Sequence, residues 1–128
     1  MKQQKKEIWS LDLAINLYDC DKSKFTNAKI KKFADTISEI IDEEGANIVG
    51  IINDFGQGNE EMEGYRLIHE NQNSMITAHF VKHQSKAFIN VHSCQGYSVY
   101  NVIEACKKYF ETESYWCQKI FREYEDKK

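Results

Sequence analysis

The sequence contains no proline and has no excess of basic residues. Without proline, no slow native cis-proline step is expected in folding. Among its 128 residues, acidic side chains outnumber basic ones, and the formal net charge is −3. A protein of this charge lacks the positive field that holds nucleic acid phosphates, so we expect no nucleic acid among its partners.

Long apolar segments are also missing. No apolar run approaches the roughly 20 residues that a membrane-spanning helix needs, so no membrane partner is expected. The opening residues MKQQKKEIWS lack the apolar core of a secretory signal, which predicts a cytoplasmic location. Hydrophobic residues make up 41% of the chain and charged residues 29%, a balance typical of one globular domain of this length.

The cysteines are widely spaced and include no CxxC pair. Zinc ribbons and dithiol redox centres depend on such close pairs, so the sequence favours neither. In a reducing cytosol we expect free thiols, and at least one of them is a candidate for chemistry rather than structure. The four residues are Cys20, Cys94, Cys106 and Cys117.

Apolar periodicity predicts six strands and two helices in the order β-α-β-β-β-β-α-β. Helical spacing predicts a helix over residues 27–44, with Thr26 or Asn27 as its cap and Gly45 at its end. Ser98 is expected to cap the second helix, whose apolar face extends from residue 99 to 110. The predicted strands cover residues 9–17, 47–53, 64–69, 74–80, 86–93 and 115–121.

Several connections between these strands are too short for a crossover helix, which requires antiparallel neighbours. Both helices would then lie on one face of the sheet. The predicted fold is an α/β two-layer sandwich, a mainly antiparallel sheet with two helices packed on one face. Apolar residues on the uncovered face would favour pairing with a second copy, sheet to sheet, so we expect a homodimer.

Polar residues concentrate between positions 69 and 94, where the chain reads HENQNSMITAHFVKHQSKAFINVHSC. All four histidines lie there, together with Ser74 and Cys94. Ser74 stands at the junction of a turn and a strand, where a backbone can be held strained. Strand alternation puts His79 on one face of its strand, and it puts His92 and Cys94 on one face of the next.

Three interpretations of this stretch compete. The first is that these are strand and turn residues with no shared task. The second is a metal site, although strand geometry places two of its ligands awkwardly across a turn; its ligands would be His79, His83, His92 and Cys94. The third is nucleophilic chemistry by a serine or cysteine beside a histidine. No GxSxG elbow is present, which argues against an ordinary serine hydrolase.

The spacing Ser-x4-His-x14-Cys is met by Ser74, His79 and Cys94. In this spacing the chain resembles the short bacterial and archaeal S-adenosylmethionine decarboxylases, and the resemblance extends over nearly its whole length. Further similar motifs are the turn YDCD at Tyr18–Asp21, Gly45–Ala46 before the second strand, the loop FGQG and the helix VIEACKKYF. The loop lacks the proline that the family has there.

The resemblance implies a self-processing proenzyme. The Ser74 hydroxyl would attack the carbonyl of Asn73, with His79 assisting as an acid or base, and the resulting ester would eliminate residues 1–73. Ser74 would become a pyruvoyl group, a self-generated cofactor that forms a Schiff base with the substrate amine. Cys94 would return a proton to the α-carbon after carbon dioxide leaves. No metal or external cofactor is implied.

The function that follows is a pyruvoyl-dependent decarboxylase of polyamine biosynthesis. Residues 1–128 would form a single decarboxylase-like domain cleaved between Asn73 and Ser74, acting on a small amino-acid-type substrate. The alternative is a pseudoenzyme that keeps the fold and regulates an active paralogue by forming a heterodimer.

Several positions depart from the family. Asn73 and Met75 stand where the family has glutamate and histidine, and the segment Phe80–His83 replaces Thr-Trp-Pro-Glu. In the family that glutamate holds the ribose hydroxyls of S-adenosylmethionine, a contact that His83 cannot reproduce. A serine of the family's glycine loop has no clear counterpart, and Arg66 is one candidate for its place.

These departures predict a changed substrate, and the resemblance implies ornithine or arginine, because some relatives of this family have moved to basic amino acids. A basic amino acid needs a carboxylate for its distal cation. The candidates for substrate binding are His83, Glu63 in the Glu60–Glu63 loop, and Asp12.

Overall fold

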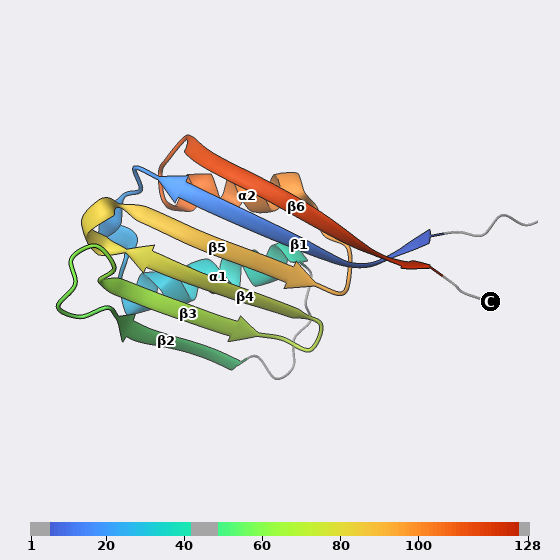
Figure 1. The fold of residues 1–128 in the computed structure, drawn as a ribbon, viewed down its shortest axis with the longest axis horizontal. Coiled ribbons are helices and arrows are strands. Elements are labelled where there is room, and N and C mark those ends of the chain that lie inside the picture. Colours follow the sequence, from blue (N-terminus) through green and yellow to red (C-terminus); the bar gives the residue numbers. More distant parts are fainter. Residues whose placement is uncertain (1–5, 42–48, 126–128) are drawn as a thin grey trace, which may run out of the picture.

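Six antiparallel strands form one sheet in the order β2-β3-β4-β5-β1-β6 (Figure 1). The computed structural model describes residues 6–41 and 49–125. The strands are β1 (Lys6–Tyr18), β2 (Val49–Phe55), β3 (Gly64–Glu70), β4 (Ser74–Val81), β5 (Lys86–Ser93) and β6 (Ser114–Glu125). The predicted element order is confirmed.

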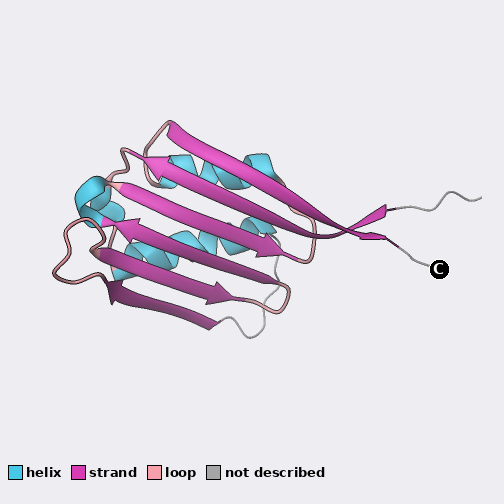
Figure 2. Ribbon diagram, viewed as in Figure 1, coloured by secondary structure: helices cyan, strands magenta, loops and turns pink. Residues whose placement is uncertain are grey.

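Helices α1 (Asn27–Ile41) and α2 (Val99–Tyr109) cover the same face of the sheet (Figure 2). The Thr26 hydroxyl accepts the Lys29 N–H at 3.2 Å and so caps α1, and Ser98 caps α2 by accepting the Asn101 N–H at 3.1 Å. The predicted two-layer sandwich is therefore confirmed. The predicted end of the first helix at Gly45 lies outside the described residues. The described residues also contain two short 3-10 helices, η1 (Lys22–Lys24) and η2 (Lys82–Gln84).

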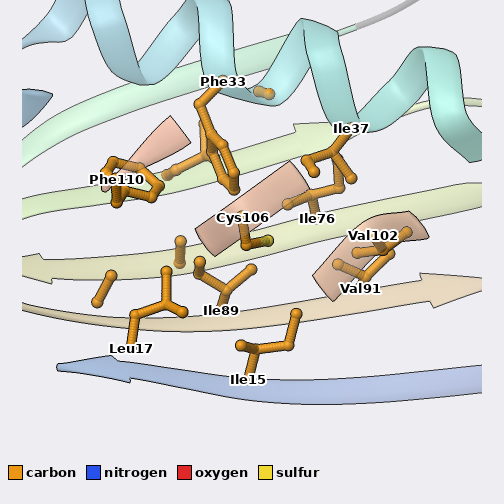
Figure 3. Close-up of a cluster of buried hydrophobic side chains, with 14 of the residues drawn as sticks. Ile15, Leu17, Phe33, Ile37, Ile76, Ile89, Val91, Val102, Cys106 and Phe110 are labelled. Carbon is orange, nitrogen blue, oxygen red and sulfur yellow. The ribbon is translucent and has the colours of Figure 1, made fainter. Parts of the chain in front are cut away.

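The core fills the space between the helices and the sheet. Alternate residues of β1 point into it, and Leu13, Ile15 and Leu17 are at most 1% exposed. Figure 3 shows Phe33 of α1 and Phe110 at the end of α2 above the strands, and their ring centroids are 4.8 Å apart. All four cysteines lie in the described part of the chain and are free thiols, as predicted.

The opposite face of the sheet, which we call the open face, carries exposed apolar side chains. Neither described helix covers it. Its large hydrophobic residues are between 37% and 47% exposed, and they are Ile51, Ile68, Met75, Trp116 and Ile120. Such a row of apolar side chains on a sheet marks a surface suited to packing against another layer.

Three strand ends extend beyond the predicted ends by two residues or more. Pairing between β1 and β6 extends to Lys6 and Glu125, well beyond the apolar alternation, because backbone hydrogen bonds do not depend on side-chain polarity. Strand β2 extends to Phe55 rather than ending at residue 53, because Asp54 pairs with Tyr65 and Phe55 with Gly64.

None of the helices that the structure describes is long and apolar enough to span a bilayer.

Candidate active site

Ser74 is the first residue of β4 and lies directly opposite Ser93 of β5. Its residue is 7% exposed and its side chain faces the helix layer, as do Ile76 and Ala78 further along the strand. The turn before it is closed by the Asn71 N–H, which donates to the Ser74 carbonyl at 2.9 Å.

The carbonyl of Asn73 has a specific donor. The backbone N–H of Cys94, which follows β5, donates to this oxygen at 2.8 Å. A donor at this distance polarises a carbonyl and stabilises negative charge that develops on it, as in an oxyanion hole.

The position of Ser74 at a turn suggested backbone strain, but Ser74 is not among the residues with positive φ. The described non-glycine residues with positive φ are Asp19, Ser85 and Glu111, all remote in sequence from the Asn73–Ser74 bond. The described backbone next to this bond therefore contains no left-handed residue.

His79 lies on the same strand as Ser74 but does not approach it. The two are five positions apart along the strand, roughly 17 Å, and an odd offset puts their side chains on opposite faces. His79 Nε2 is 3.0 Å from the Met62 carbonyl oxygen, and its ring packs edge-on to Phe55 with centroids 4.9 Å apart. Within one chain, His79 therefore cannot act on the Asn73–Ser74 bond.

Cys94 is exposed and lies beside a polar chain of contacts. Its Sγ is 4.0 Å from His92 Nε2, and the other ring nitrogen of His92 forms a hydrogen bond with Asp12 of β1. The second oxygen of Asp12 accepts the Arg122 Nε–H of β6 at 2.8 Å. The backbones of Asn73 and Cys94 are thus in contact, whereas the Cys94 thiol lies beside His92 and Asp12 and the Ser74 side chain faces the helix layer.

The charge of Asp12 is stabilised by these contacts. Burial raises the pKa of its carboxyl, but the hydrogen bonds and charges of His92 and Arg122 outweigh that effect, and the pKa lies below its ordinary value. Asp12 is consequently ionised at neutral pH and can only accept hydrogen bonds.

The other candidate binding residues gather at the opposite end of the sheet. His83 Nε2 is 3.0 Å from a carboxylate oxygen of Glu63, so these two predicted residues are in contact. Nearby, the Arg66 guanidinium lies 3.9 Å above the Phe55 ring, and Arg66 pairs with His79 across β3 and β4. The candidate residues therefore form two groups, one around Ser74 and one around His79.

This separation bears on the metal interpretation. His79 and His83 lie in one group and His92 and Cys94 in the other, so these four cannot share an ion within one chain. In the described ranges, no three histidine, cysteine or acidic side chains converge as ligands.

Comparisons with known proteins decide the family. The family model for S-adenosylmethionine decarboxylase matches residues 11–123. The chain belongs to the S-adenosylmethionine decarboxylase family. Members of this family are pyruvoyl-dependent decarboxylases, and the predicted family is confirmed. A comparison with curated proteins gave no match.

The fold agrees with a solved structure of that description. The crystal structure of the adenosylmethionine decarboxylase from Aquifex aeolicus VF5 matches with a TM-score of 0.74. The match covers 91% of this chain and 92% of that chain at 14% sequence identity. At this identity the likeness concerns the fold alone.

Two features of this family member were missed from its sequence. Neither the pairing of His92 with Asp12 nor the contact of Arg122 with Asp12 was predicted. Asp12 and His92 also line a cavity of about 250 Å³ on the open face. Its other lining residues include Ala14, Asn90, Gln118 and Ile120. Alternation could have put Asp12 and His92 on polar faces of their strands, but only the register brings those faces together.

Proposed function

We propose that this chain is a self-processing, pyruvoyl-dependent decarboxylase that cleaves itself between Asn73 and Ser74. The observation that carries the proposal is the hydrogen bond from the Cys94 N–H to the Asn73 carbonyl. This donor would stabilise negative charge on the Asn73 oxygen when Ser74 attacks, and it joins the backbone of Cys94 to the cleavage site.

Self-processing needs only groups of this chain and water. The Ser74 hydroxyl adds to the Asn73 carbonyl carbon, and the peptide bond becomes an ester as the amine of Ser74 is released. Loss of the Ser74 α-proton expels the Asn73 carboxylate and leaves dehydroalanine. Water then replaces the nitrogen, ammonia departs, and residue 74 is a pyruvoyl group at the start of β4.

The pyruvoyl group supplies an electron sink that lets an amino-acid substrate lose carbon dioxide. The backbone of Cys94 is hydrogen-bonded to Asn73, and we assign its exposed thiol as the group that donates a proton to the substrate α-carbon. A thiol suits this step because it is a weak acid that can pass its proton to carbon.

For the substrate we propose a basic amino acid such as ornithine or arginine. Asp12 is unsuited to the distal cation because His92 and Arg122 already occupy its two oxygens. Glu63 has one oxygen against His83 and a second that no described hydrogen bond takes up. Glu63 is therefore the carboxylate that we propose for the distal cation, with His83 holding it in place.

Carbon dioxide release should be assayed with S-adenosylmethionine, ornithine and arginine side by side. We expect turnover of a basic amino acid, and we expect Glu63→Gln to raise its KM about 10–100-fold, because a charge-assisted hydrogen bond is lost. Glu60→Gln, in the same exposed loop, is the matched control and should leave KM unchanged. Turnover of S-adenosylmethionine alone would contradict the proposed substrate while leaving the reaction type intact.

For His79 we propose a role across a homodimer interface. Exposed apolar residues such as Ile68 and Trp116 make the open face suited to a second sheet. We propose a two-fold axis that lies between the facing sheets and runs across their strands. This arrangement sets β4 against the partner β4 in the reverse direction. The His79 end of one chain, with Glu63 and His83, then lies over the open-face side of the Asn73–Ser74 peptide bond of the other.

Complementation between two inactive chains tests this arrangement. Chains with Ser74→Ala and chains with His79→Ala are each expected to remain uncleaved when expressed alone. When the two are co-expressed, the His79→Ala chain should be cleaved, because its partner supplies the histidine. Denaturing gel analysis with distinguishable tags measures the outcome. Cleavage of the His79→Ala chain by itself, or none in the mixture, would rule out a shared site.

A further inference from the structure

A continuous series of polar contacts crosses three strands that are far apart in the sequence. It joins Cys94, His92, Asp12 and Arg122. The series begins at the Cys94 thiol after β5, passes through the imidazole of His92, and ends at a carboxylate of β1 that Arg122 of β6 also binds. Asp12 and His92 are also direct neighbours in the β1–β5 register. The arrangement is therefore built into the sheet rather than into a loop.

The protonation of Asp12 and His92 follows from these contacts. An ionised Asp12 can only accept, so the Nδ1 of His92 that faces it carries a hydrogen. When the ring is neutral, Nε2 has a free lone pair, and this is the nitrogen that faces Cys94 Sγ at 4.0 Å. Asp12 thus selects the tautomer in which His92 can take a proton from the thiol or return one to it.

We propose that His92 and Asp12 form a proton relay that keeps the Cys94 thiol supplied with protons, with Arg122 positioning Asp12. The inference rests on the proposed function in one respect, namely that Cys94 gives its proton to the substrate α-carbon. No external oxidant or reductant takes part. Each turnover moves one proton from Cys94 to carbon, one from His92 Nε2 to the thiolate, and one from solvent to His92.

Exposure and charge support each transfer. The His92 side chain is 40% exposed and can exchange protons with water. The imidazolium that forms transiently lies beside the negative charge of Asp12, and the Arg122 guanidinium prevents that carboxylate from rotating away. Burial, and then the charge of Asp12, raise the pKa of the Tyr97 phenol. Tyr97 therefore stays neutral and does not supply protons to the relay.

The test measures the thiol itself in a chain that cannot form the cofactor. In a Ser74→Ala background, the rate of Cys94 alkylation by iodoacetamide is followed by peptide mass spectrometry. At neutral pH we expect His92→Gln to slow this rate about tenfold, because a base that draws the proton from the thiol is lost. Asp12→Asn should slow it less, since the tautomer is no longer selected.

Two controls separate the relay from a structural effect. Asn90→Ala changes a neighbouring side chain of the same strand and face and should leave the Cys94 rate unchanged, and Cys117 in each variant reports general unfolding. Near pH 10, where a thiol ionises without help, the rates of all variants should converge. Equal rates at neutral pH in the parent and His92→Gln chains, or a deficit that persists at high pH, would overturn the relay. Because Ser74 is absent throughout, failure of self-processing cannot produce either result.

Discussion

A Ser74→Ala chain is expected to remain one uncleaved polypeptide and to release no carbon dioxide from any substrate. The alanine has no hydroxyl to add to the Asn73 carbonyl, so neither the ester nor the pyruvoyl group can form. Without that group no electron sink exists, and the loss of activity should be complete rather than partial. Gel mobility and carbon dioxide release measure the two consequences.

Ser93→Ala is the matched control for this variant. Ser93 lies directly opposite Ser74, is also buried, and accepts the Gln95 N–H with its hydroxyl at 3.0 Å. Its loss removes one hydrogen bond, worth about 1 kcal/mol of the free energy of unfolding, but no reacting group. Ser93→Ala should therefore be cleaved and active. Cleavage of the Ser74→Ala chain at the same bond would contradict the role of Ser74.

Cys94→Ala is expected to separate cleavage from decarboxylation. The donor to the Asn73 carbonyl is the backbone N–H of residue 94, which alanine retains, so self-cleavage should proceed. The thiol that protonates the substrate is lost, and kcat should fall about 10²–10⁴-fold, the usual contribution of a general acid. Single-turnover carbon dioxide release and product analysis measure this decrease.

Cys117→Ala provides the comparison, because Cys117 of β6 is a half-buried free thiol away from Ser74. It should keep the parent kcat. If Cys94→Ala also keeps the parent kcat, then Cys94 is not the proton donor and only its backbone contributes to the site.

Local patterns in the sequence predicted most of the fold. Apolar alternation and helical spacing predicted all eight main elements, and the short connections predicted the antiparallel sheet with one covered face. The β1–β6 ribbon was underestimated at Lys6 and Glu125, because pairing there depends on the partner strand and not on apolar side chains. The same reason explains the continuation of β2 to Phe55.

The candidate site was predictable only in part. The spacing motif included Ser74 and Cys94, and pairing of β4 with β5 places the backbone of Cys94 against Asn73. It also suggested that Ser74 and His79 act together, although an odd offset along a strand places two side chains on opposite faces. That consequence was available from the sequence alone.

The Asp12–His92–Arg122 contacts were not available in the same way. Asp12 and His92 are 80 positions apart, and Asp12 and Arg122 are 110 positions apart. Their contact depends on the register of β1 between β5 and β6, and a slip by one residue would turn one partner to the other face. Alternation within a strand gives the face of a side chain but not its neighbour in the next strand.

The most direct test of self-processing is the intact mass of the purified parent chain. We predict two species in place of one of 15.0 kDa, namely residues 1–73 and residues 74–128. The second should be lighter than a fragment that begins with an intact serine, because pyruvoyl has replaced it. A chain that stays at its full mass, and releases no carbon dioxide from any of the three substrates, would contradict the proposal and favour a non-catalytic partner of the same fold.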